Sequence, residues 1–150
     1  MLKKSIILIA ASIIALNLAC SKKVVDSGAV KSEIVESQSF FQTTWVLIKI
    51  NTRQIKSPEG TNPVTLFIDE ESKNVNGYAG CNRYFGKVEQ KKTSIKFSQM
   101  GSTKMMCPPA NMSIEDSYLP ALNKVDNYLI SGNELQLRKG ETAILTFVAQ

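Results

Sequence analysis

The sequence contains no histidine, and this absence removes the commonest side chain for both acid–base chemistry and metal binding. Serine and cysteine hydrolases usually take their general base from histidine. Zinc sites usually combine histidine with cysteine, and the three cysteines of this chain form no Cys-x-x-Cys pair. We therefore expect no histidine-dependent hydrolase, no metal site and no cofactor.

Arginine-rich runs and basic stripes with interleaved aromatic residues are also missing. The 150 residues carry a formal net charge of +5, which is a mild excess. Nucleic-acid-binding proteins instead cluster lysine and arginine on one face or along one helix. The sequence therefore predicts no nucleic-acid partner.

The chain begins with a short apolar run that is not long enough to span a membrane. Lys3 and Lys4 precede an apolar segment from Ile6 to Leu16. A spanning helix needs about 20 residues. A basic start followed by a run of this kind is typical of a cleaved export signal. We predict a lipoprotein signal peptide over residues 1–19.

The segment after this run, Leu16-Asn17-Leu18-Ala19-Cys20, resembles the bacterial lipobox, in which a cysteine is acylated and the chain is cut before it. Asn17 departs from that motif, which has an apolar residue three positions before the cysteine. We predict lipidation of Cys20. The alternative is ordinary signal cleavage that leaves Cys20 as a free thiol. Lys22 and Lys23 either approach anionic headgroups, contributing about 1 kcal/mol each, or lie in solvent.

Residues 20–39 are predicted to be a flexible tether. They are rich in Ser, Lys, Glu and Val, contain no aromatic residue, and show neither helical nor alternating apolar spacing. Ser21 follows the predicted lipid site, where some bacteria place an aspartate to hold lipoproteins on the inner membrane. We therefore expect a lipid-anchored envelope protein on the outer membrane, facing the periplasm.

Residues 40–150 are predicted to form one mainly β domain, which we expect to be monomeric. Short runs of β-branched and aromatic residues recur at even spacing, and the first of them places Trp45 in the core. About eight strands of this kind predict a small, antiparallel, barrel-like sheet. The expected strands cover residues 45–50, 53–56, 64–69, 75–79, 84–88, 94–97, 128–130, 134–138 and 143–148.

One segment breaks the β pattern. Tyr118, Leu122 and Val125 have helical spacing, which predicts a single helix around residues 111–125 that covers one opening of the sheet. Pro120 lacks the N–H that a helix interior needs. We therefore expect the helix to kink at Pro120, or to start again at residue 117.

The start of this helix carries two sets of capping candidates. Asn111 or Ser113 is expected to cap it, and Ser113 with Asp116 resembles a capping box. Glu115 and Asp116 also suit the positive end of the helix dipole.

Two unusual stretches contain the remaining cysteines. Gly77-Tyr78-Ala79-Gly80-Cys81-Asn82-Arg83-Tyr84-Phe85-Gly86 has three glycines in ten residues, which indicates bends or close backbone approach. Ser102-Thr103-Lys104-Met105-Met106-Cys107-Pro108 is the second. In an exported domain an even pair of cysteines favours a disulfide, so we predict a Cys81–Cys107 bridge. Two buried free thiols and a metal site are the alternatives.

These two stretches resemble the META domain family of HslJ-like heat-shock proteins. Trp45-x-Leu47 at the start and Leu145-x-Phe147 at the end match as well, so the resemblance covers residues 40–149. It implies a compact, barrel-like antiparallel β structure with one helix, and an envelope location that is often secured by lipid. It also implies a link to heat response and to sensitivity to novobiocin. It implies no established reaction and therefore no catalytic residues.

We therefore expect a non-enzymatic envelope protein that supports tolerance of heat or novobiocin-type stress. A carboxylate pair could still act, but the acids at 69–71 fall on a turn and those at 115–116 at a helix start. Cys81 or Cys107 could act as a nucleophile only if unpaired. The alternative function is a periplasmic module that binds a small ligand or another envelope protein through the Gly77–Gly86 region.

Within that region Asn82 and Arg83 are the candidate binding residues, because arginine can fork onto a carboxylate or phosphate. The competing structural interpretation is that Asn82 satisfies backbone groups, Arg83 pairs with an acid and the neighbouring aromatic residues fill the core. We expect the methionines to lie in the core as well.

Overall fold

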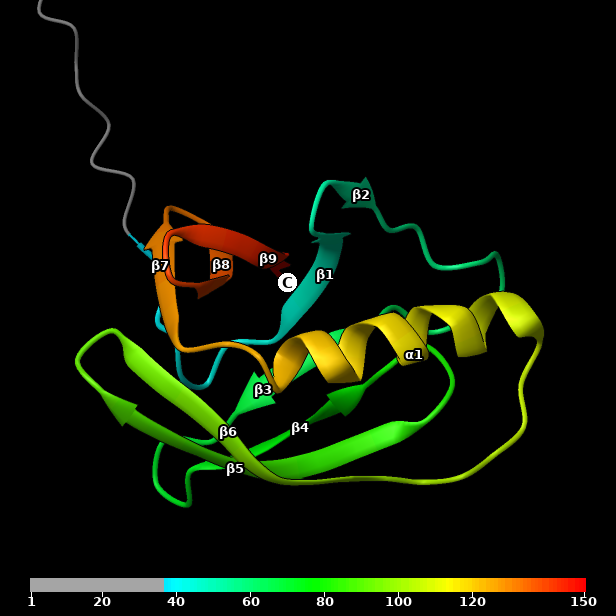
Figure 1. Cartoon of the computed structure of the whole chain (residues 1–150), viewed down its shortest axis with the longest axis horizontal. Helices are drawn as coiled ribbons and strands as arrows, with labels where there is room; N and C mark the ends of the chain where they lie inside the picture. Colours follow the sequence, from blue (N-terminus) through cyan, green and yellow to red (C-terminus); the bar gives the residue numbers. More distant parts are fainter. Residues whose placement is uncertain (1–36) are drawn as a thin grey trace, which may run out of the picture. The chain divides into compact units, whose positions relative to one another are not determined.

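Nine strands and one helix make up residues 37–150, the part of the chain that the computed structural model describes (Figure 1). The predicted signal peptide, Cys20 and tether residues 20–36 lie outside this part. The prediction of a mainly β domain with one helix is confirmed. The elements are β1 (Trp45–Ile50), β2 (Arg53–Gln54), β3 (Thr65–Ile68), β4 (Asn74–Tyr78), β5 (Arg83–Lys91), β6 (Ser94–Ser102), α1 (Pro109–Leu122), β7 (Asn127–Ser131), β8 (Glu134–Lys139) and β9 (Thr142–Ala149).

The strands form one antiparallel sheet that returns on itself. Its order is β2-β1-β3-β4-β5-β6-β7-β8-β9, and β1 also pairs with β9, so the sheet is ring-like. The β6–β7 step is short, with Ser94 opposite Asn127 as its register pair. Helix α1 is inserted in the chain at this step and lies between strands β3–β6 and strands β1 and β7–β9 in Figure 1.

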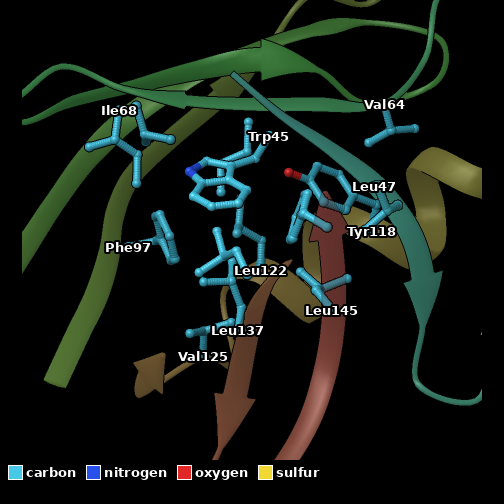
Figure 2. Close-up of a cluster of buried hydrophobic side chains, with 14 of the residues drawn as sticks. Trp45, Leu47, Val64, Ile68, Phe97, Tyr118, Leu122, Val125, Leu137 and Leu145 are labelled. Atoms are coloured by element: carbon cyan, nitrogen blue, oxygen red, sulfur yellow. The ribbon is translucent and has the colours of Figure 1, made fainter. Parts of the chain in front are cut away.

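The interior of the ring is filled with side chains. Trp45, as expected, is fully buried, and its Nε1–H donates to the backbone oxygen of Phe40 at 3.3 Å. Figure 2 shows Tyr118 and Leu122 of α1 lying in the same cluster as Trp45 and the strand residues around it. The helix therefore covers the opening of the sheet, and its apolar side chains pack with those of the strands inside the ring.

The helix begins two residues earlier than predicted and ends at Leu122, three residues before Val125. It continues through Pro120, so the expected restart at residue 117 is wrong. Pro120 lies in the last turn and is exposed. Since the carbonyl that loses its partner belongs to the exposed Asp116, water can satisfy it.

The predicted capping arrangement is also wrong. Pro108 is the N-cap, Pro109 opens the helix, and no side chain caps it. Proline suits this position because the first N–H groups of a helix have no intrahelical partner. The first turn contains no acidic residue, so Glu115 and Asp116 do not lie at the positive end of the dipole. The Asn111 side chain instead donates to the Gly80 carbonyl at 2.8 Å.

The described domain has a self-contained core. Its buried apolar cluster runs from Phe40 to Phe147 along the chain. The described part has 114 residues (150 − 36), which is enough to fold alone. Within it, no helix combines the length and the apolar character that crossing a membrane requires.

Candidate functional site

The predicted disulfide is confirmed. Cys81 and Cys107 are bonded, with their α-carbons 5.8 Å apart and a sequence separation of 26. Cys81 lies in the turn between β4 and β5, and Cys107 lies just before α1. The bridge therefore fixes the two unusual stretches of the sequence against each other.

Asn82 holds the same two stretches together through hydrogen bonds. Its side-chain oxygen accepts from the Thr103 hydroxyl at 2.9 Å and from the Met105 N–H at 2.7 Å. Its side-chain amide donates to the Met105 carbonyl at 3.3 Å and to the carboxylate of Glu115 at 3.1 Å. Asn82 is buried, and its polar groups are satisfied by the protein. This arrangement favours the structural interpretation of Asn82 over a binding role.

Glu115 ties α1 to this network. One carboxylate oxygen accepts from the Asn82 side chain, and the other accepts from the Asn82 backbone N–H at 2.6 Å. Within residues 37–150, Glu115 is the one residue with a carboxylate side chain that is buried. The carboxylate of Glu115 on the helix therefore lies against the β4–β5 turn. Its two oxygens accept the hydrogen bonds that the two amide groups of Asn82 would otherwise donate to water. We name the disulfide, Asn82 and Glu115 the motif lock.

Two glycines allow the backbone to approach closely here. Gly80 has a φ of +109°, and an added Cβ would lie 3.1 Å from the Asn111 carbonyl oxygen. At Gly77 an added Cβ would lie 2.0 Å from the carbonyl oxygen of Thr65 on β3. Any larger residue at Gly77 would therefore separate β3 from β4.

A tyrosine pair supports the inner side of the same turn. The Tyr84 hydroxyl donates to the Thr65 carbonyl at 2.8 Å and lies 2.8 Å from the Tyr118 hydroxyl, which then donates to it. Burial is the main cause that raises the pKa of Tyr84 well above its ordinary value, and burial also raises the pKa of Tyr118. Both hydroxyls therefore stay protonated and serve the fold.

A groove lies on the outer face of the sheet beside the motif lock. We call it the outer groove; its volume is about 1110 Å³. Phe67 on β3, Asn76 on β4 and Phe85 on β5 stand opposite one another in register. Its lining residues are Thr44, Asn62, Pro63, Thr65, Phe67, Asn76, Gly77, Tyr78, Arg83, Tyr84, Phe85, Thr103, Met105 and Gln150.

Arg83 projects a charge into this groove. It stands opposite Tyr78 on β4, and its backbone carbonyl accepts from the Thr103 N–H at 3.0 Å. The expected acid partner is wrong: among residues 37–150 the ion pair is Lys139 with Asp126, at 3.0 Å. The structure thus separates Asn82 and Arg83, since one is buried in the motif lock and the other faces the outer groove.

The expectation that the neighbouring aromatic residues fill the core holds for Tyr84 and is wrong for Phe85, which is 59% exposed. The expectation that the methionines lie in the core is also wrong for three of the four described methionines. Met100 packs against the core. The side chains of Met105, Met106 and Met112 are 62%, 93% and 39% exposed.

Sequence reasoning missed Phe67 and Glu115. Phe67 lies between Leu66 and Ile68, which are both fully buried. Strict alternation along that strand was a signal that Phe67 faces outward. No comparable local signal marked Glu115, because its partner Asn82 lies 33 residues away in the sequence.

The family described as META domain matches residues 38–150 of the chain. Among solved structures, the chain is similar to an NMR structure of a protein from Burkholderia xenovorans, with 30% sequence identity and a TM-score of 0.61, over 73% of this chain and 83% of that one. A second NMR structure is 22% identical over 72% of this chain and 87% of that chain, with a TM-score of 0.53, and it supports the fold alone. No curated protein matches the chain.

Proposed function

Because this chain belongs to the META domain family, we propose that it is a non-enzymatic, lipid-anchored protein of the bacterial cell envelope. We propose further that it supports tolerance of heat and of novobiocin-type antibiotics from the outer membrane, facing the periplasm. The anchor is the acylated Cys20 at the start of the tether.

The observation that carries this proposal is the Cys81–Cys107 disulfide. Disulfides persist in oxidising compartments such as the periplasm and are rare in the cytosol. The same chain begins with an export-signal pattern that ends at Cys20. The disulfide and the export-signal pattern both support an envelope location.

A non-enzymatic role is supported by the use that the fold makes of its buried titratable groups. Both oxygens of Glu115 accept hydrogen bonds from Asn82. The hydroxyls of Tyr84 and Tyr118 bond to each other, and Tyr84 also bonds to backbone. An acid or base held in this way is not poised to exchange protons with a substrate.

The proposal is tested in a deletion strain that is complemented with either the wild-type chain or Cys20→Ser. We expect the deletion to reduce growth under heat and under novobiocin, the wild-type chain to restore growth, and Cys20→Ser to fail. Mass spectrometry of the purified wild-type chain should find an acylated N-terminal Cys20. Unchanged growth of the deletion strain under both stresses would refute the stress role, and an unmodified Cys20 would refute the anchor.

A second candidate function, a binding module, is favoured by the exposure of Phe85 in the outer groove. Large apolar side chains in a concave surface mark ligand and partner sites. Complementation with Phe85→Ser tests this function without knowledge of the ligand. The matched control is Leu129→Ser, because Leu129 is 48% exposed and lies on β7, outside the groove. We expect Phe85→Ser to fold but not to restore stress tolerance, and Leu129→Ser to restore it; equal restoration by both variants would refute binding at the groove.

A further inference from the structure

We infer that the outer groove binds a small amphipathic anion, with its anionic group at Arg83 and a flat apolar body against Phe67 and Phe85. This inference rests on the second candidate function above and adds the chemical class of the ligand. It follows from the charge, the apolar surface, the polar rim and the rigidity of the groove.

The first step is the charge of the groove. Arg83 is exposed, and the lining of the groove contains no Asp, Glu or Lys side chain. Among residues 37–150, no carboxylate pairs with Arg83. The planar guanidinium presents two parallel N–H donors that match carboxylate or phosphate oxygens. An exposed guanidinium without an ion-pair partner among residues 37–150 therefore favours a ligand with an anionic group.

The second step is the apolar surface beside this charge. Phe85 is 59% exposed and Met105 is 62% exposed, while Phe67 is half-buried. Phe67 and Phe85 stand on either side of Asn76 in register. Two strand spacings place them about 10 Å apart. A flat aromatic body lying over Asn76 would contact both rings, and such contacts add to simple area burial.

The third step is the rim, which offers neutral hydrogen-bonding groups. Asn62, Asn76 and Thr103 line the groove together with the apolar residues. They can bond to neutral polar substituents of a ligand but cannot compensate a second negative charge. The groove volume, about 1110 Å³, lies slightly above the roughly 300–1,000 Å³ that ligand pockets typically span, so the groove has room for a small molecule.

The fourth step is that the site is already formed without a ligand. The backbone of Arg83 is paired with Tyr78 on one side and with Thr103 on the other. Cys81, two residues earlier, is held by the disulfide. Binding therefore needs to order the Arg83 side chain but not the loop that carries it, and preorganisation of this kind lowers the entropic cost of association.

The test uses the described domain, residues 37–150, labelled with ¹⁵N and titrated with 2-naphthoate or with its uncharged analogue 2-naphthamide. We expect 2-naphthoate to shift the backbone amide signals of Tyr78, Arg83 and Phe85. Binding of 2-naphthamide should be about tenfold weaker or more, the value of a charge-assisted hydrogen bond. Arg83→Gln should weaken 2-naphthoate binding by the same factor and leave 2-naphthamide binding unchanged.

The matched control is Arg53→Gln, which removes the same charge from the exposed strand β2 outside the groove. It should leave 2-naphthoate binding unchanged. Equal affinity for the two probes, or an Arg83→Gln variant that binds 2-naphthoate like wild type, would overturn the anion selectivity. Signal shifts confined to other surfaces, or no binding of 2-naphthoate, would also overturn the inference. The binding function itself is judged separately, by Phe85→Ser in cells.

Discussion

Glu115 on helix α1 accepts hydrogen bonds from both the backbone N–H and the side-chain amide of Asn82. These two residues are 33 positions apart, and both are buried. The contact joins the helix to the β4–β5 turn next to the disulfide. It ties the turn to the helix, and the residue that follows Asn82 is Arg83, at the outer groove. The motif lock thus serves the surface that we propose binds a ligand.

The first prediction concerns the close approach of β3 and β4. Gly77→Ala should lower the free energy of unfolding by at least about 2 kcal/mol, because the new Cβ meets the backbone of Thr65. Urea denaturation of residues 37–150 measures this loss. The control is Gly60→Ala: Gly60 has a φ of +74° but open space around it, so only backbone strain of about 1–2 kcal/mol is expected. A Gly77→Ala domain as stable as wild type would contradict the described packing.

The second prediction concerns the disulfide. Its sequence separation of 26 predicts that reduction lowers the free energy of unfolding by about 3.5 kcal/mol, by the chain-entropy relation. We expect dithiothreitol to lower the Tm of residues 37–150. The variant in which both Cys81 and Cys107 are replaced by serine should unfold at that lower Tm with or without dithiothreitol. If the reductant left the Tm of the wild-type domain unchanged and the double-serine variant unfolded at that same Tm, the bridge would be absent in solution.

The third prediction concerns alkaline pH. Burial raises the pKa of Tyr84 and Tyr118 above the ordinary value of 10.0. A group with a raised folded pKa stabilises the fold below the unfolded value, and this contribution declines as the pH rises above about 10. We therefore expect tyrosinate absorbance of these two residues to appear only together with unfolding. In Tyr84→Phe the unfolding step should release one tyrosinate fewer. Ionisation of both tyrosines in a domain that stays folded would refute their burial.

The fourth prediction concerns acidic pH. The hydrogen bond from the Gly140 backbone N–H, at 2.9 Å, is the main cause that lowers the pKa of Asp126 below 3.8, and the Lys139 ammonium group adds to it. A lowered folded pKa means that the ionised group stabilises the fold above about pH 3.8, and that this effect is lost as the pH falls through the folded value. Asp126→Asn should therefore be less stable than wild type at neutral pH, and the difference should shrink in acid.

Urea denaturation at a series of pH values measures this trend. The control is Asp116→Asn. Asp116 is an exposed carboxylate on α1 that, unlike Asp126, accepts no hydrogen bond from Gly140. If the loss of unfolding free energy in Asp126→Asn stayed constant down to low pH, the ionised carboxylate of Asp126 would not be what stabilises the fold.

Most of the fold could be predicted from the sequence because its signals are local. Leu135 and Leu137 alternate with polar residues, and both are fully buried in β8. The helix followed from the spacing of Tyr118 and Leu122. The start of the helix could not be predicted in the same way. Local rules assign the side chain of Asn111 to the N-cap, but in the structure it donates a tertiary hydrogen bond to Gly80.

The candidate site was only partly predictable. The sequence identified the stretch that contains Asn82 and Arg83, but it did not indicate that Asn82 is buried while its neighbour Arg83 is exposed. The environment of each residue depends on the partners that the fold brings close. Asn82 meets Glu115, whereas Arg83 forms no ion pair with an acid among the described residues. Pairing across more than 30 residues leaves no periodic trace in the chain, so it appears only in three dimensions.

A double-mutant cycle in residues 37–150 measures whether Asn82 and Glu115 couple helix α1 to the β4–β5 turn. Urea denaturation would compare Asn82→Ala, Glu115→Ala and the double variant with wild type. We predict that each single variant loses about 2–4 kcal/mol of unfolding free energy. The double variant should lose less than the sum, with a coupling energy of at least about 1 kcal/mol. Losses that add to within about 0.5 kcal/mol would show that the two residues act independently and that they do not couple the helix to the turn.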